Sequence, residues 1–203
     1  QGESAIERYR NFPSIVFGLE QALRSMKSQT PFELFPSRFL KGDPIPINGL
    51  IWMGDQGYMK AQVREKVEQG FRCLKLKIGA LDFDEELRLL SEIRREFGGE
   101  ALEIRVDANG AFSPGDALNK LKKLSELDLH SIEQPVAPGS GDLMAELCLK
   151  TPLPIALDEE LIGYVDREEK YRLLQDVRPQ YIILKPSLVG GFSGSREWIE
   201  AAE

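Results

Sequence analysis

Two hydrophobic periods alternate along most of this chain. From Ile47 onward, short apolar runs typical of strands are followed by stretches whose apolar residues recur at helical spacing. The predicted strands are residues 47–53, 71–78, 102–106, 129–133, 154–158 and 181–185, and the predicted helices are residues 59–69, 82–97, 113–127, 143–149, 166–175 and 195–203. This alternation predicts an α/β fold with a parallel sheet flanked by helices, as either an open sheet or a barrel.

Polar and special residues mark several helix ends. Gly70 follows the helix at 59–69, and Asp82 is suited to cap the next helix. Ser113 and Asp116 have the spacing of a capping box, with Pro114 predicted at the first helical position.

The first forty or so residues follow a different pattern. Residues 14–27 have apolar positions at mostly helical spacing, and the prolines and glycines of KGDPIPING then interrupt regular structure. We expect a domain boundary near Asp43, which separates residues 1–43 from residues 44–203.

Composition narrows the class of protein. The chain has 203 residues, 42% hydrophobic and 29% charged, with a net charge of −7, which argues against nucleic acid or an anionic membrane as the main partner. The sequence holds no apolar run near the ~20 residues of a membrane span, and its start lacks the pattern of a secretory signal. Cys73 and Cys148 form no disulfide framework, so a cytoplasmic protein is expected. The sole histidine, His130, is expected to have a structural role.

An ionisable residue ends each of five consecutive predicted strands. They are Lys77, Asp107, Glu133, Asp158 and Lys185, at intervals of 25–30 residues. A β/α barrel needs about 31 residues per unit and builds its sites at the C-terminal strand ends. Loops that begin with a charge are a simpler explanation for any one strand. The repetition over five strands argues for a site.

The three acidic residues in this series predict a metal site. Converging carboxylates repel one another unless a cation lies between them, and oxygen ligands favour Mg²⁺, with Mn²⁺ as a substitute. Asp158 has an alternative, because Asp158-Glu159-Glu160 also has the composition of a helix start. We assign Asp158 to the metal and the two glutamates to the following loop or helix.

A lysine base beside such a metal suggests proton removal next to a substrate carboxylate. Lys75 and Lys77 share one face of their strand. A neighbouring cation and burial both lower the pKa of a lysine, which a base requires. The alternative, that both lysines are solvated edge residues, fits poorly with an otherwise apolar strand.

The segments LKLKIG, VDANG, IEQP, LDEE and ILKPS, in this order, resemble the enolase superfamily in its muconate-lactonizing-type branch. The resemblance extends from about Ile47 to Ser195. It implies a TIM-type (β/α) barrel in residues 44–203, with about six of eight strands, after a helical remnant of an N-terminal capping domain in residues 1–43. It also implies a small-molecule carboxylate substrate, Mg²⁺ and a possible homo-oligomer.

The resemblance further implies a role for each matching residue. Asp107, Glu133 and Asp158 bind magnesium. The remaining residues surround the substrate: Lys77 as acid/base, Lys185 as its opposing partner, Lys75 as an assisting cation, Asn109 as an orienting residue, and Ser187, Gly190 and Gly191 as pocket residues.

Residues 183–195, ILKPSLVGGFSGS, are most similar to a dehydratase of menaquinone biosynthesis within this branch. In that reaction Lys77 would remove the proton and Lys185 would stabilise the enediolate as a cation. An N-acylamino acid racemase or dipeptide epimerase is the alternative enzyme, and a catalytically inactive barrel that acts as a binding subunit is the alternative class. Amides at residues 190–195 are expected either to hold a substrate carboxylate or to form a flexible loop.

Overall fold

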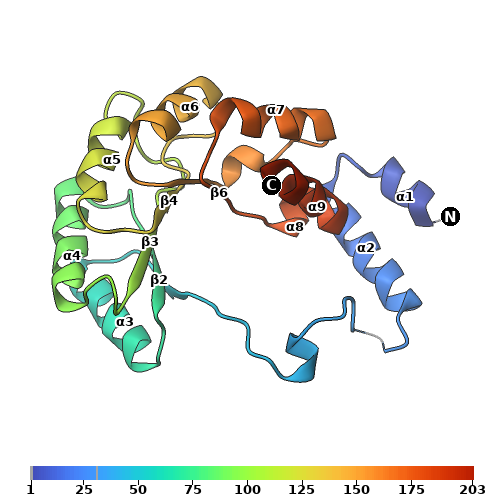
Figure 1. Cartoon of the computed structure of the whole chain (residues 1–203), viewed down its shortest axis with the longest axis horizontal. Helices are drawn as coiled ribbons and strands as arrows, with labels where there is room; N and C mark the ends of the chain where they lie inside the picture. Colours follow the sequence, from blue (N-terminus) through green and yellow to red (C-terminus); the bar gives the residue numbers. More distant parts are fainter. Residues whose placement is uncertain (1, 31) are drawn as a thin grey trace. The chain divides into compact units, whose positions relative to one another are not determined.

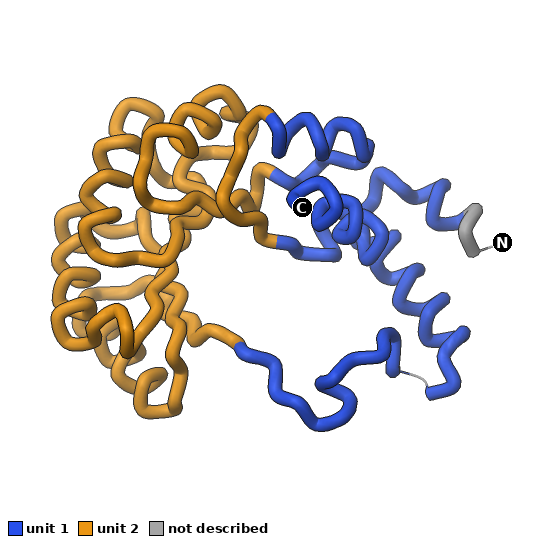
Figure 2. The backbone as a smooth tube through the Cα atoms, viewed as in Figure 1, with its two compact units in different colours: residues 1–46, 161–175, 184–203 blue, residues 47–160, 176–183 orange. Residues whose placement is uncertain are grey.

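The computed structural model describes residues 2–30 and 32–203 and divides into two compact units (Figure 2). The first unit comprises residues 1–46, 161–175 and 184–203, and the second comprises residues 47–160 and 176–183. The first break lies after Pro46, near the expected boundary at Asp43. Division into a capping remnant at 1–43 and a barrel at 44–203 stays a prediction.

The second unit is built on a parallel sheet whose strand order follows the chain. Its strands are β1 (Gly49–Ile51), β2 (Cys73–Lys77), β3 (Glu103–Asp107), β4 (Ser131–Glu133), β5 (Ile155–Leu157) and β6 (Tyr181–Ile182). Open doubly wound sheets reverse their strand order at a switch point. A sheet that adds each strand beside the previous one is instead the arrangement of a β/α barrel.

Helices connect the strands and cover one side of the sheet. In the second unit they are α3 (Gln56–Glu68), α4 (Phe83–Glu96), α5 (Ala117–Ser125) and α6 (Gly141–Lys150). The 3₁₀ turn η2 (Glu159–Leu161) and α7 (Arg167–Val177) come next along the chain, and most of α7 belongs to the first unit. Helices α3 to α6 pack side by side in chain order on the outer side of β2 to β4 (Figure 1). In β2, Leu74 and Leu76 are fully buried, whereas the alternate residues Lys75 and Lys77 are only partly buried. The two faces of the strand therefore separate the core from the site.

The first unit is helical in the part that the structure describes. It contains α1 (Gly2–Arg8), α2 (Pro13–Lys27), the 3₁₀ turn η1 (Phe39–Lys41), most of α7, α8 (Pro186–Val189) and α9 (Gly191–Ala202). The helix at 14–27 is confirmed, while α1 was not predicted. Helix α2 packs against both α8 and α9, so residues from opposite ends of the chain share one core.

Predicted helix signals were right at two ends and wrong at a third. Asp82 accepts a hydrogen bond from Asp84 N at 3.1 Å as the cap of α4, and Gly70 follows α3 with φ of 92°. In contrast, α5 begins at Ala117 and Pro114 precedes it. The Ser113 hydroxyl donates to the Asp116 carboxylate at 2.9 Å, which leaves the expected capping box unmade.

The last predicted strand and helix also differ from the structure. Strand β6 ends at Ile182, so Lys185 lies beyond it, at the N-cap of α8. Helix α9 begins at Gly191 instead of Ser195, because Gly190 adopts the left-handed backbone conformation between α8 and α9. Within the described residues, no helix has the length and apolar character needed to cross a membrane.

Candidate active site

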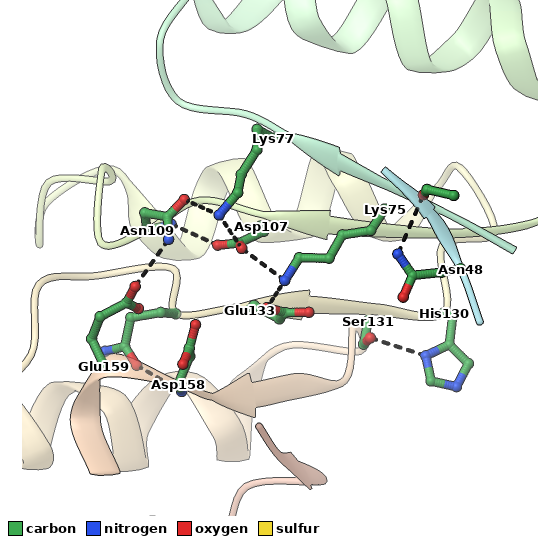
Figure 3. Close-up of polar contacts among 12 residues, drawn as sticks. Asn48, Lys75, Lys77, Asp107, Asn109, His130, Ser131, Glu133, Asp158 and Glu159 are labelled. Atoms are coloured by element: carbon green, nitrogen blue, oxygen red, sulfur yellow. Dashed lines mark hydrogen bonds and ion pairs between the residues drawn. The ribbon is translucent and has the colours of Figure 1, made fainter. Parts of the chain in front are cut away.

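Strand register places three of the predicted site residues in one row of the sheet. Lys77 pairs with Asp107 across β2 and β3, and Asp107 pairs with Glu133 across β3 and β4. Glu133 then pairs with Ala156 of β5. Asp158 follows Ala156 by two positions, and alternate residues of a strand share a face. The row and its extension therefore bring the side chains to one edge of the sheet (Figure 3).

The three carboxylates converge as the sequence predicted. Asp107, Glu133 and Asp158 are at most 3% exposed, and each offers one oxygen within 4.8 Å of the others. Their oxygen atoms are the ligand type that a hard divalent cation prefers. Buried like charges this close are costly without a compensating cation. The cluster therefore fits a divalent metal ion.

Two lysines lie against the same carboxylates. The ammonium of Lys77 donates to Asp107 Oδ2 at 2.6 Å. The ammonium of Lys75 lies 2.9 Å from the same oxygen and also donates to Glu133 Oε2. Both lysine side chains are about one-fifth exposed. They are partly buried cations inside the site, which excludes the alternative of solvated edge residues.

Burial and the lysine–carboxylate contacts shift the pKa values of Lys75, Asp107 and Glu133 in opposite directions. Burial alone lowers the pKa of Lys75, but its hydrogen bonds to Glu133 and Asp107 outweigh burial and raise it. Burial raises the pKa of Asp107, yet the bonds from Lys77 and Lys75 hold it below its usual value. For Glu133, burial and the charges of Asp107 and Asp158 outweigh Lys75, so its pKa is raised. Lys75 thus remains the fixed cation beside Lys77 that the sequence suggested.

Asn109 links Lys77 to Glu159, which was expected in the loop or helix after the fifth strand and begins the 3₁₀ turn η2. Its Oδ1 accepts from Lys77 Nζ at 2.7 Å, and its Nδ2 donates to Glu159 Oε1 at 2.9 Å. The other carboxylate oxygen of Glu159 is buried and makes no hydrogen bond to the described residues. Asn109 also has φ of 44°, an uncommon value for a residue other than glycine. The two hydrogen bonds that connect Glu159, Asn109 and Lys77 fix the direction of the lysine ammonium.

Gln134 organises the end of β5, a role the sequence did not indicate. It is fully buried, and its Oε1 accepts from the backbone amides of Asp158 at 3.2 Å and Glu160 at 3.1 Å. Its Nε2 donates to Glu160 Oε2 at 3.2 Å. The residue directly after one predicted metal ligand therefore holds the backbone of another.

A buried glutamate holds the loop that follows Lys77. Glu86 of α4 accepts from the backbone amides of Gly79, Ala80 and Leu81 at 2.7–3.1 Å through a single oxygen. Burial raises the pKa of Glu86, although the three amide hydrogen bonds oppose that effect. The contact ties the end of the lysine-bearing strand to the helix behind it.

The remaining predicted residues belong to the first unit. Lys185 occupies the N-cap position of α8 without a capping hydrogen bond from its side chain, Ser187 lies within α8, and Gly190 and Gly191 form the turn into α9. Their predicted roles toward substrate stay predictions. The amides at the start of α9, expected to hold a substrate carboxylate or to form a flexible loop, instead donate to the side chain of Glu20.

The histidine and the two cysteines have structural surroundings. His130 stacks on Tyr181 with ring centroids 4.9 Å apart and shares a hydrogen bond with Ser131. Cys73 and Cys148 are both free. Burial raises the pKa of the Cys73 thiol to about 11, with help from Glu103, and raises that of Cys148 to about 12.

The parallel β/α sheet with charged residues at its strand ends agrees with the protein family that this chain matches in sequence. Residues 58–203 match the enolase C-terminal domain-like family, and the chain belongs to that family. The fold is therefore the TIM-type barrel of the enolase superfamily, as the strand-end motifs predicted.

One relative shares more than half of its aligned residues with this chain. The chain is 54% identical over 192 residues to o-succinylbenzoate synthase of Desulfotalea psychrophila, which covers 94% of this chain and 52% of the relative. The crystal structure of MenC from Desulfotalea psychrophila matches with a TM-score of 0.78 at 54% identity, over 84% of this chain and 47% of the other.

A second kind of relative catalyses a different reaction. L-Ala-D/L-Glu epimerase of Bacillus subtilis is 29% identical over 147 residues, covering 71% of this chain and 39% of the relative. The chain thus spans about half the length, or less, of the curated relatives it matches.

Proposed function

We propose that this chain carries the acid/base and metal-binding groups of an o-succinylbenzoate synthase-like dehydratase. The reaction class rests on one observation: Lys77 lies 2.6 Å from Asp107 at a cluster of three buried carboxylates. The choice of substrate is supported by 54% identity to o-succinylbenzoate synthase. The substrate would be a succinyl-hydroxycyclohexadiene carboxylate, and the pathway menaquinone biosynthesis.

Asp107, Glu133 and Asp158 would hold the cation, which we propose to be Mg²⁺, with Mn²⁺ as a substitute. When bound, such an ion supplies Lewis-acid stabilisation of charge on carboxylate oxygens. The protein side chains then have separate tasks. Asn109 and Glu159 direct the Lys77 ammonium, and Lys75 provides a constant positive charge next to it.

Lys77 in its neutral form would remove the proton next to the ring carboxylate. The electron pair left on carbon moves toward the carboxylate, which gives an enediolate. Lys185 would stabilise this anion as a cation without exchanging a proton. The hydroxyl then leaves as water on the side of Lys77, which returns the proton it took. The ring becomes aromatic, and no oxidant is needed.

A direct assay separates the dehydratase from its alternatives. Purified full-length protein with Mg²⁺ should convert the cyclohexadiene carboxylate to o-succinylbenzoate, and Lys77→Ala should not. Racemisation of N-acylamino acids or dipeptides in deuterated water, with deuterium incorporated and no dehydration, would support the epimerase alternative instead. Full biological function of Lys77→Ala would support the inactive binding subunit.

The compartment and assembly are part of the same proposal. Both cysteines are free, and reduced cysteines are usual in the cytoplasm, which we propose as the location. A homo-oligomer remains a prediction, with a small-molecule carboxylate as substrate and neither nucleic acid nor membrane as partner.

A further inference from the structure

We infer that Glu20 is a positioning residue for the segment from Lys185 to Gly191, which it holds by capping helix α9. The inference rests on the proposed function, because that function assigns Lys185, Ser187 and the two glycines to the substrate. Glu20 lies on α2, more than 160 residues away in the sequence, and none of the strand-end motifs includes it.

The contact of Glu20 is specific and buried. Its side chain accepts hydrogen bonds from the backbone amides of Phe192 and Ser193, the latter at 3.2 Å to Oε1. Glu20 is 9% exposed. The first amides of a helix have no partner within the helix, and its N-terminus favours negative charge. One carboxylate from α2 therefore satisfies two such amides of α9.

The turn before α9 is shaped around this carboxylate. Gly190 and Gly191 have φ of 98° and 72°, values that favour glycine. A Cβ added to Gly191 would overlap Glu20 Oε2 and press on Val16 Cγ1 at 3.2 Å. The absence of a side chain at Gly191 is thus what lets the carboxylate reach the amides.

Two further contacts join α2 to the same segment. The Ser14 hydroxyl donates to the carbonyl of Ser187 at 2.8 Å. The ring of Phe192 meets Phe17 of α2 edge to face, with ring centroids 5.1 Å apart, and also meets Phe35, which lies after α2 in the sequence, at 4.8 Å. Helix α2 therefore holds the segment at Ser187, at the turn and at Phe192. The position of the Lys185 backbone follows from this attachment, since Lys185 is the N-cap residue of α8.

The contact with Glu20 also determines what the first amides of α9 can bind. A carboxylate already fills the place where an anionic group of a substrate would bind, so the substrate is excluded from these amides. Its recognition depends instead on the side chains and backbone that the cap keeps in place. Loss of Glu20 should change both the order of the turn and substrate turnover, while leaving the carboxylate cluster of the second unit intact.

Glu20→Ala in the full-length protein tests this inference, with Gln21→Ala as the control on the same helix. Gln21 makes a hydrogen bond within α2, to Phe17 O. Glu20→Ala should speed amide hydrogen exchange at Phe192 and Ser193 at least tenfold. It should also lower kcat/KM at least tenfold, with Mg²⁺ affinity within twofold of wild type. Acetate should restore part of both losses, and Glu20→Gln should give intermediate values.

A double-mutant cycle with Gly191→Ala adds a second measure. The backbone strain from φ of 72° is common to both backgrounds, whereas the overlap with Glu20 exists only when Glu20 is present. Gly191→Ala should therefore cost at least threefold less in kcat/KM when Glu20 is already alanine.

Three outcomes decide between the explanations. Faster exchange at Phe192 with unchanged kcat and KM would overturn the positioning role. If Glu20→Ala lowered Mg²⁺ affinity and thermal stability together with kcat/KM, Glu20 would have a purely structural role. That result would also overturn the positioning role. Wild-type protein without dehydratase activity would refute the proposed function alone, and the exchange and acetate measurements would still decide whether Glu20 holds the segment.

Discussion

Adding Mg²⁺ to wild type and to Asp158→Asn tests the carboxylate cluster directly. Two carboxylate charges at 4.8 Å, the upper limit of the separations in this cluster, repel by about 3–4 kcal/mol at an effective dielectric constant of about 20, and a bound divalent cation removes that cost. At a Mg²⁺ concentration 100 times its Kd, the folded protein gains about 2.7 kcal/mol. For a chain of this size the midpoint of thermal unfolding should rise by about 5–11 °C.

Asp158→Asn removes one anionic ligand and should weaken Mg²⁺ binding by at least about 100-fold, because even outer contacts of metal ligands contribute 10–100-fold. At the same Mg²⁺ concentration the gain then falls to about 0.4 kcal/mol, or about 1–2 °C. Thermal unfolding followed by circular dichroism at constant ionic strength measures both shifts. Glu146→Gln, which changes an exposed carboxylate paired with Lys150, is the matched control and should keep the full shift. Equal shifts in wild type and Asp158→Asn would show that these carboxylates do not bind the ion.

Three other expectations concern single side chains. Arginine stays protonated, so Lys77→Arg should lower kcat at least about 10³-fold. Lys185→Arg keeps the positive charge, so its kcat should fall less than about 100-fold. Equal losses of kcat in the two variants would favour the epimerase, which uses both lysines as bases. Iodoacetamide at pH 8 should modify Cys73, whose pKa is about 11, roughly 200-fold more slowly than a free thiol of pKa 8.5, and reaction at the free-thiol rate would contradict the buried setting. Glu86→Ala should cost about 2 kcal/mol of unfolding free energy in urea, because three amides lose their acceptor; an unchanged midpoint would show that this contact does not stabilise the loop.

The residues that the sequence predicted share a simple geometric origin. Asp107 and Glu133 end parallel strands, and parallel strands in a barrel meet at one edge, so strand position alone brought them together. Lys75 and Lys77 followed from the period of two along a strand. These arguments need only local pattern and parallel order, both of which are visible in a single sequence.

The residues that the sequence did not predict depend on contacts between distant segments. Glu20 binds amides 172 and 173 positions later, and Glu159 reaches Asn109 across 50 positions. Such partners become visible only once the helices are packed. The shortening of the helix at 113–127 has a local cause instead, since the hydroxyl of Ser113 bonds the side chain of Asp116 rather than the helix backbone.

The cross-strand pairing of Lys77, Asp107 and Glu133 has a consequence for how this protein can change. A deletion of one residue in β3 would turn Asp107 toward the helices and bring an apolar neighbour to the inner edge. The reactive groups therefore tolerate no sliding of one strand against the next. Replacements in the connecting loops leave this register unchanged, so they can alter the surroundings of the site without moving these three side chains.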